Sequence, residues 1–179
     1  FAYSQYVIDE LYSNNSINKT AMQVGLLWED PFTIDGLNLR AEYNIVGGYT
    51  YSYANNPKQS YTHYNHSLAH PLGANFSEKL FSASYLHKKF AFFGMFSMVN
   101  GGIDTKDNSM GQNIFSNEPP NDFKGGLLPK LTQNDASILL VDLRLHYIVN
   151  NKSKLNVFAE FLFRQTKNTE IPQKNMLFQ

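Results

Sequence analysis

The chain has 179 residues, a length that suits one domain or a piece of a larger one. Its 15 lysines and arginines balance 15 aspartates and glutamates, so it lacks the basic surface that nucleic-acid binding requires, and we expect no nucleic-acid partner. It has no cysteine, which excludes disulfides and thiolate metal sites, and no apolar run of about 18 residues, which excludes a transmembrane helix.

Apolar and polar residues alternate with a period of two through much of the chain. In residues 37–45 every odd position is apolar and every even position is polar, the pattern of a half-buried strand. No segment with a helical period competes with the strands, so the sequence predicts an all-β, antiparallel fold. The strands are expected at 1–9, 20–28, 37–45, 79–87, 90–100, 139–147 and 155–163, with 175–179 as the start of an eighth.

The connections between these strands alternate between long and short. In an up-and-down sheet, alternate connections lie at the same end, so all the long loops are expected on one side. Short turns opposite longer loops, with strands of about 9–11 residues, are typical of outer-membrane barrels. The long loops are 47–78 and 101–135, with a medium one at 10–19; the short turns are 29–36, 87–89 and 150–153.

We therefore interpret residues 1–179 as a single segment of an antiparallel up-and-down transmembrane β-barrel, with about seven to eight strands of a larger barrel. The long loops would be extracellular and the short turns periplasmic. Phe1 is not an initiator methionine, and seven strands cannot close a bacterial barrel, so we expect an interior piece of a longer protein. The alternative is a soluble β-sandwich or lipocalin-like barrel with its apolar face turned inward.

Charged residues occupy mid-strand positions, where a polar lumen could accommodate them. We expect a lumen polar network whose charges compensate one another, in preference to a selectivity filter. Its members are Arg40, Glu42, Asp142, Arg144, Glu160 and Arg164.

Histidines 63, 66 and 70 fall within eight residues, in the pattern H-x₂-H-x₃-H. Imidazole is a common zinc ligand, but the segment has no helical period, Pro71 ends it, and no acidic residue is expected nearby as a second-shell partner. We therefore predict no metal site and interpret these histidines as hydrogen-bonding groups that fold a long loop over the barrel mouth.

An outer-membrane phospholipase is the enzyme alternative, because residues 65–67 (Asn-His-Ser) contain suitable residue types. That chemistry needs a nucleophile beside its base, and the segment shows no such pattern. Asp104, Asp107 and Asn108 resemble Ca²⁺ ligands in type but lack the spacing of an EF-hand loop. We expect no catalytic residue and no cofactor.

Tyrosines 49, 51, 53, 61 and 64 surround the histidines. Tyrosine rings stack on the C–H surfaces of sugars while Asn and His side chains bond hydroxyl groups, so a glycan-binding role is chemically sound. Packing of the loop itself is the alternative role. The candidate binding residues are Tyr51, Tyr61, His63, Tyr64, His66, His70 and Asn75.

Six stretches of the sequence, in chain order, are Val7-Ile8-Asp9-Glu10-Leu11, Leu39-Arg40-Ala41-Glu42-Tyr43-Asn44, Tyr49-Thr50-Tyr51-Ser52, His63-Tyr64-Asn65, the AHPLGANF run at 69–76, and Gly111-Gln112-Asn113-Ile114-Phe115. Together they resemble the C-terminal half of the capsule-assembly Wzi-like family, and most of all its gliding-motility RemB-like branch in Bacteroidota. The similarity runs over nearly the whole chain, and AHPLGANF is its most specific part.

The resemblance implies an outer-membrane barrel of about sixteen to eighteen strands, which attaches capsular or other surface polysaccharide or takes part in gliding motility without being an enzyme. Its partners would be outer-membrane lipid and lipopolysaccharide, surface polysaccharide and other outer-membrane proteins. The alternative is an accessory subunit of a larger outer-membrane complex for secretion, motility or nutrient uptake. Two features depart from the family: Gln179 follows Phe178 where a terminal aromatic is expected, and residues 116–135 lack the usual Tyr- and Gly-rich form.

Overall fold

The computed structural model is built almost entirely from β-strands. It describes residues 1–10, 19–53, 61–63, 66–104, 109–115, 135–150, 155–168 and 173–178. The main strands are β1 (Ala2–Glu10), β2 (Lys19–Glu29), β3 (Leu37–Val46), β6 (Phe76–His87), β7 (Phe90–Gly102), β8 (Asp135–Asn150), β9 (Leu155–Asn168) and β10 (Gln173–Phe178). A 3₁₀ turn, η1 (Pro31–Thr33), and a small hairpin, β4 (Thr62–His63) with β5 (His66–Ser67), complete the described elements.

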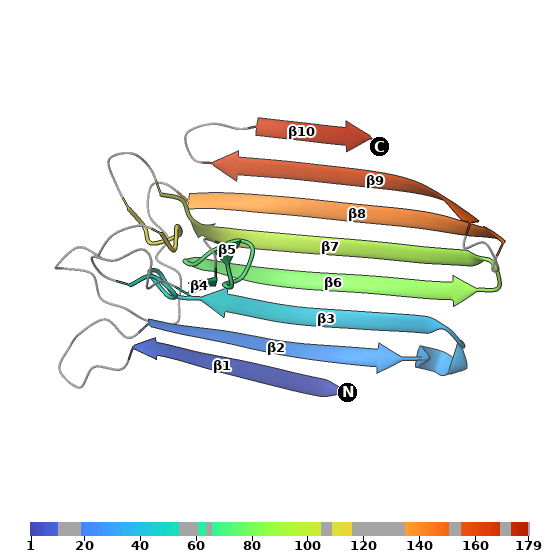
Figure 1. The fold of residues 1–179 in the computed structure, drawn as a ribbon, viewed down its shortest axis with the longest axis horizontal. Helices are drawn as coiled ribbons and strands as arrows, with labels where there is room; N and C mark the ends of the chain where they lie inside the picture. Colours follow the sequence, from blue (N-terminus) through green and yellow to red (C-terminus); the bar gives the residue numbers. More distant parts are fainter. Residues whose placement is uncertain are drawn as a thin grey trace.

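The main strands form one sheet in the order β1-β2-β3-β6-β7-β8-β9-β10. Each strand pairs antiparallel with the next one along the chain, apart from the hairpin that interrupts the numbering (Figure 1). This confirms the predicted all-β, antiparallel, up-and-down arrangement. Among the described strands the sheet is open, with β1 and β10 at its two edges. Among the described residues, no helix is both long and apolar enough to cross a membrane.

The long and short connections lie at opposite ends of the sheet, as predicted (Figure 1). We call the two ends the loop end and the turn end. At the turn end, residues 30–36 join β2 to β3, and Lys88 and Lys89 alone join β6 to β7. The predicted turn at 150–153 begins at Asn150, the last residue of β8, and its other residues lie outside the described part of the chain.

The strands at the loop end are longer than the alternation predicted. β6 begins at Phe76 and β8 at Asp135, because the backbone pairing continues past the clearest alternation, with Phe76 opposite Gly101 and Asp135 opposite Gly102. The two long connections are therefore 47–75 and 103–134, shorter than the predicted 47–78 and 101–135.

The pairing register assigns every side chain to one of two faces, since residues directly opposite each other point to the same side. In β1–β3 and β6–β9, the apolar face carries the odd positions of β3, β6, β8 and β9 and the even positions of β1, β2 and β7; the polar face carries the other positions of these strands. One cross-strand row of the apolar face is Leu39, Ala83, Gly94, Leu143 and Phe161. A row of the polar face is Glu42, Leu80, Ser97 and Leu140.

Large side chains of the apolar face are exposed, while several carboxylates of the polar face are buried. On β8, Leu143 is 49% exposed and its neighbour Asp142 only 3%. Globular proteins in water normally show the reverse, with large apolar side chains covered and carboxylates in solvent. Other exposed members of the apolar face include Leu26, Trp28, Phe81, Phe96 and Val157.

The hydrophobic core lies at the loop end of the polar face. Ala21, Val46, Phe76 and Val99 come from four strands, and Ala74 from the loop before β6 packs on them. The loop residues therefore provide the cover that this part of the sheet needs.

A close contact joins the first three strands on the polar face. The Tyr3 hydroxyl donates to Glu42 Oε1 across Gly25, which lies between them on β2. A Cβ atom on Gly25 would collide with the Tyr3 ring. Glycine at this position thus allows an edge-strand tyrosine to reach a buried carboxylate two strands away.

We expect Gly25→Val to lower the free energy of unfolding by about 1–3 kcal/mol, the usual cost of overpacking. The loss should shrink when Tyr3 is already alanine, because the collision is then removed. Gly94→Val is the matched control, since a Cβ there meets only Leu143 Cδ2, at 3.4 Å. Chemical denaturation of the four variants measures these differences, and an equal loss from Gly25→Val in both backgrounds would contradict the contact.

Candidate functional site

Three loop segments pack together over the polar face at the loop end. Tyr49 is fully buried among them; its hydroxyl donates to the Ser109 carbonyl (2.8 Å) and its N–H to the Gly111 carbonyl (2.9 Å). Gly111 has a φ of +75°, and a Cβ there would collide with the Tyr49 ring. We call segments 47–53, 66–75 and 109–115 the loop cluster.

The AHPLGANF stretch forms a turn that joins the rest of this cluster. The Gly73 N–H donates to the His70 carbonyl (2.8 Å), which closes the turn around Pro71. The next N–H, of Ala74, donates to the Gln112 carbonyl (2.9 Å). Gly73 has a φ of +79°, a conformation that favours glycine.

Asp104, considered from the sequence as a Ca²⁺ ligand by type, organises the neighbouring loop. Its carboxylate accepts the backbone N–H groups of Met110 and of Asn113, the latter at 2.8 Å. These bonds give the carboxylate a structural role. Asp107 and Asn108 lie outside the described residues.

A buried carboxylate fastens the AHPLGANF turn to the sheet. Glu78 on β6 accepts from Asn44 Nδ2 (2.9 Å) and from Ser97 Oγ (2.6 Å), and His70 Nε2 lies 3.3 Å from Glu78 Oε2. A buried carboxylate is stable only when it is partnered in this way. Its three partners come from β3, β7 and the loop, so Glu78 joins three parts of the chain.

The backbone contact of His70 indicates which of its ring nitrogens carries the proton. The Leu72 N–H donates to His70 Nδ1 (3.3 Å), so Nδ1 acts as the acceptor and Nε2 carries the proton. The imidazole also lies 4.7 Å from the Phe76 ring, centroid to centroid. The expectation that no acidic residue lies near the histidines is therefore wrong. The turn at Pro71 places Glu78, which comes later in the sequence, beside the His70 side chain.

The three histidines do not converge. His63 and His66 lie opposite each other on the β4–β5 hairpin and are both exposed, whereas His70 points to Glu78. Within the described part of the chain, no group of three His, Cys, Asp or Glu side chains could hold a metal ion.

A cavity of about 520 Å³ lies between β1–β3 and the loop cluster. On the polar face, Gln5, Gln23 and Asn44 stand directly opposite one another on three neighbouring strands and line it as a row of amides. Gln5 and Gln23 each offer a donor and an acceptor, which suits a ligand with many hydroxyl groups, whereas the Asn44 amide is 4% exposed and already donates to Glu78.

Two tyrosines form the aromatic wall of this cavity. The rings of Tyr51 and Tyr61 stack with centroids 5.6 Å apart and an interplanar angle of 28°. The Tyr61 N–H donates to the Tyr51 carbonyl (2.9 Å), and the Tyr51 N–H donates to Asp9 Oδ2 (3.0 Å). Burial raises the pKa of Tyr51, with Asp9 and Tyr61 adding to the shift, so its hydroxyl stays protonated at neutral pH. Tyr61 is 54% exposed, which leaves one ring accessible to a ligand.

Some of the predicted binding residues line this cavity and others do not. Tyr51, Tyr61 and His70 line it, whereas His63 and His66 do not. Tyr64 lies outside the described residues.

Asn75 has a backbone role in this structure. It is fully buried in the left-handed region (φ +57°), and its carbonyl accepts the Gly102 N–H at 3.1 Å. A side chain with no exposed surface does not reach a ligand in this arrangement.

Four polar residues of the cavity were not predicted from the sequence: Gln5, Asp9, Gln23 and Asn44. The alternation of the strands indicates only that such positions share a polar face. The meeting of Gln5, Gln23 and Asn44 in one row depends on the register of β1, β2 and β3, which the alternation leaves open.

Five of the six predicted lumen-network residues form two separate ion-pair clusters on the polar face. In the first, Arg40 Nε donates to Glu42 Oε1 (3.0 Å), which also accepts from Tyr3. The buried Glu42 carboxylate is thereby partnered from two strands.

The second cluster centres on Arg144. It donates from Nη2 to Asp142 Oδ2 (2.6 Å) and from Nε to Glu160 Oε1 (2.9 Å), and its guanidinium lies 5.4 Å from the Phe93 ring centroid. Arg164, the sixth residue, is exposed and has no ion-pair partner among the described residues.

Comparison with protein-family models, curated proteins and solved structures finds no match for this chain. The geometry defines an open antiparallel sheet with one exposed apolar face and, on the other face, a polar and aromatic cavity under loops. These two features are the structural basis for assigning a function.

We expect Glu78→Ala to release the AHPLGANF turn, because His70, Asn44 and Ser97 lose a buried charged acceptor at a cost of about 2–3 kcal/mol. Hydrogen exchange of a peptide spanning 66–76 measures the release. Glu29→Ala, an exposed carboxylate at the turn end, is the control and should change protection little. Unchanged protection in Glu78→Ala would show that other contacts hold the turn.

Proposed function

We propose that the sheet is a sector of a bacterial outer-membrane β-barrel, with its apolar face against lipid and its polar face towards the lumen. The observation that carries the proposal is the inverted burial of neighbouring residues, illustrated by exposed Leu143 beside buried Asp142. In a membrane, the exposed apolar face meets hydrocarbon, and the charged groups are partnered inside the barrel.

The boundaries of the apolar face support this orientation. At the loop end of that face, Ser77, Asn100 and Ser137 form a polar cross-strand row. Towards the turn end, Tyr85 lies eight residues beyond Ser77, about 26 Å along the strand at 3.3 Å per residue. Because barrel strands are tilted by about 35–45°, this length corresponds to about 18–21 Å of height, somewhat less than the apolar band of about 25 Å that barrels carry.

Aromatic side chains gather on the apolar face near the turn end. The Phe90 and Tyr147 rings lie 5.0 Å apart, centroid to centroid, and those of Trp28 and Phe32 lie 4.9 Å apart. Such clusters are typical of the aromatic girdles at a membrane interface.

We further propose that the cavity at the loop end binds saccharide without catalysing a reaction. The stacked pair of Tyr51 and Tyr61 offers an aromatic surface for sugar C–H groups, and the amides of Gln5 and Gln23 offer donors and acceptors for hydroxyls. Together with the resemblance to the Wzi-like and RemB-like family, this supports a role in attaching capsular or other surface polysaccharide, or in gliding motility.

Trp28 tests the membrane orientation. It is the chain's one tryptophan, lies on the apolar face and is 47% exposed. In vesicles with brominated acyl chains, we expect its fluorescence to be quenched. The matched control moves the tryptophan to the polar face (Trp28→Phe with Met95→Trp), where brominated lipid should not quench it. Equal quenching at both positions, or recovery of the native protein in solution without detergent, would contradict the proposal.

Binding to an array of bacterial surface oligosaccharides tests the cavity. We expect Tyr61→Ala and Gln23→Ala each to weaken binding about tenfold or more, the loss typical of an important contact. Tyr53→Ala is the control, because Tyr53 is 48% exposed but does not line the cavity. An absence of glycan binding, together with co-purification of a large complex, would favour the accessory-subunit alternative.

A further inference from the structure

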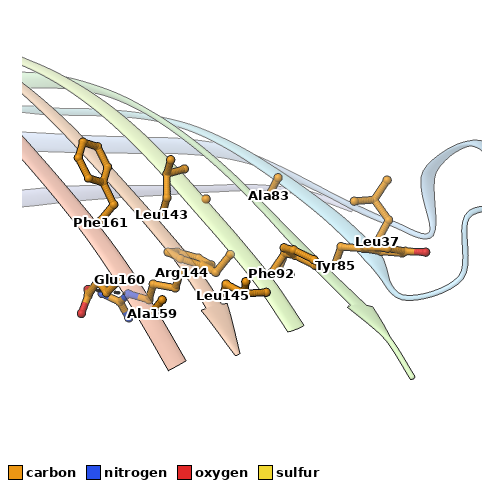
Figure 2. Close-up of a pocket in the computed structure, with 13 residues that line it drawn as sticks. Leu37, Ala83, Tyr85, Phe92, Leu143, Arg144, Leu145, Ala159, Glu160 and Phe161 are labelled. Atoms are coloured by element: carbon orange, nitrogen blue, oxygen red, sulfur yellow. Dashed lines mark hydrogen bonds and ion pairs between the residues drawn. The ribbon is translucent and has the colours of Figure 1, made fainter. Parts of the chain in front are cut away.

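A second cavity, of about 530 Å³, lies towards the turn end and is lined mainly by residues of the apolar face, with Arg144 and Glu160 of the polar face also in its lining. Figure 2 shows Phe161, Leu143, Ala83 and Leu37 projecting to the same side of the sheet around it. Tyr85 and Phe92 line its turn-end side, with their rings 6.5 Å apart, centroid to centroid. We call this cavity the apolar depression.

The absence of a side chain at Gly94 leaves the depression open, and the backbone at this position does not require glycine. A Cβ there would meet only Leu143 Cδ2, at 3.4 Å, which is ordinary van der Waals contact. By contrast, a Cβ on Gly25 would collide with Tyr3, and one on Gly36 would meet the Leu86 carbonyl oxygen at 2.5 Å. The space above Gly94 can therefore be filled by substitution without disturbing the backbone.

Charges of both signs flank the turn end of the depression. Lys88 and Lys89 are exposed in the β6–β7 turn, which follows the last residue of β6, His87. Asp35 is exposed in the neighbouring 30–36 turn, and the Leu86 N–H joins the two turns by donating to the Gly36 carbonyl (3.0 Å).

We propose that the apolar depression binds one acyl chain of a glycerophospholipid with a primary-amine headgroup, that is, a phosphatidylethanolamine. Its phosphate would lie at Lys88 and Lys89, which bind phosphate as point charges, and its ammonium at Asp35. This inference rests on the proposed membrane orientation. A phospholipid fits both features, because its acyl chain suits the depression and its headgroup carries charges of both signs. An apolar protein surface would fit the depression but not the neighbouring charges.

The test is native mass spectrometry of the protein released from vesicles of equimolar phosphatidylethanolamine and phosphatidylglycerol. We expect one phosphatidylethanolamine to be retained per chain. Gly94→Leu, which fills the depression, should reduce retention about tenfold, as expected when an apolar pocket loses its fit. Ala83→Leu is a second filling variant, and Ala41→Leu, which adds the same bulk on the apolar face outside the depression, is the control and should leave retention unchanged.

The headgroup contacts have their own test. Lys88→Gln with Lys89→Gln should lower retention several-fold, whereas Lys79→Gln, an exposed lysine on the apolar face near the loop end, should not. Equal retention by Gly94→Leu and Ala41→Leu, or a preference for phosphatidylglycerol, would overturn the inference. Quenching of Trp28 by brominated lipid in the same samples separates the two proposals, because a protein that inserts but retains no lipid contradicts only the lipid site.

Discussion

The rest of the structure depends on one constraint, the continuous antiparallel ladder from β1 to β10. Once the backbone groups are paired, side chains must alternate between two faces, and a shift of one residue would exchange the faces. The ladder therefore determines both that Leu143 is exposed and that Asp142 beside it is buried next to Arg144. Burial of the charged groups costs free energy that their ion pairs and hydrogen bonds offset.

The loops complete what the ladder begins. At the loop end, the polar face presents an apolar patch around Val46 and Phe76 and a buried carboxylate at Glu78. The AHPLGANF turn covers the patch through Ala74 and partners the carboxylate through His70. The same docking places Tyr51 and Tyr61 beside the amide row of β1–β3, so the cavity follows from how the loop is anchored.

The alternation was sufficient to predict the strands, their antiparallel order and the separation of loops from turns, because each depends on local pattern and chain order. It was insufficient where contacts depend on register or on folded loops. Glu78 and His70 meet because the chain turns at Pro71, and Gln5, Gln23 and Asn44 align through two registers. Asn75, a candidate for either glycan binding or loop packing, is completely buried, and the sequence alone does not indicate which of the two roles its burial allows.

Site-directed spin labelling along β8 would determine which face of the sheet meets lipid, since the chain has no cysteine and each label can be placed alone. Single cysteines at positions 139–147 would be labelled in vesicles, and collisions measured with oxygen, which partitions into lipid, and with a water-soluble nickel chelate. The account predicts oxygen maxima at the odd positions, including Leu143, and lower values at the even positions, including Asp142. Oxygen maxima at the even positions, or no period of two, would contradict it.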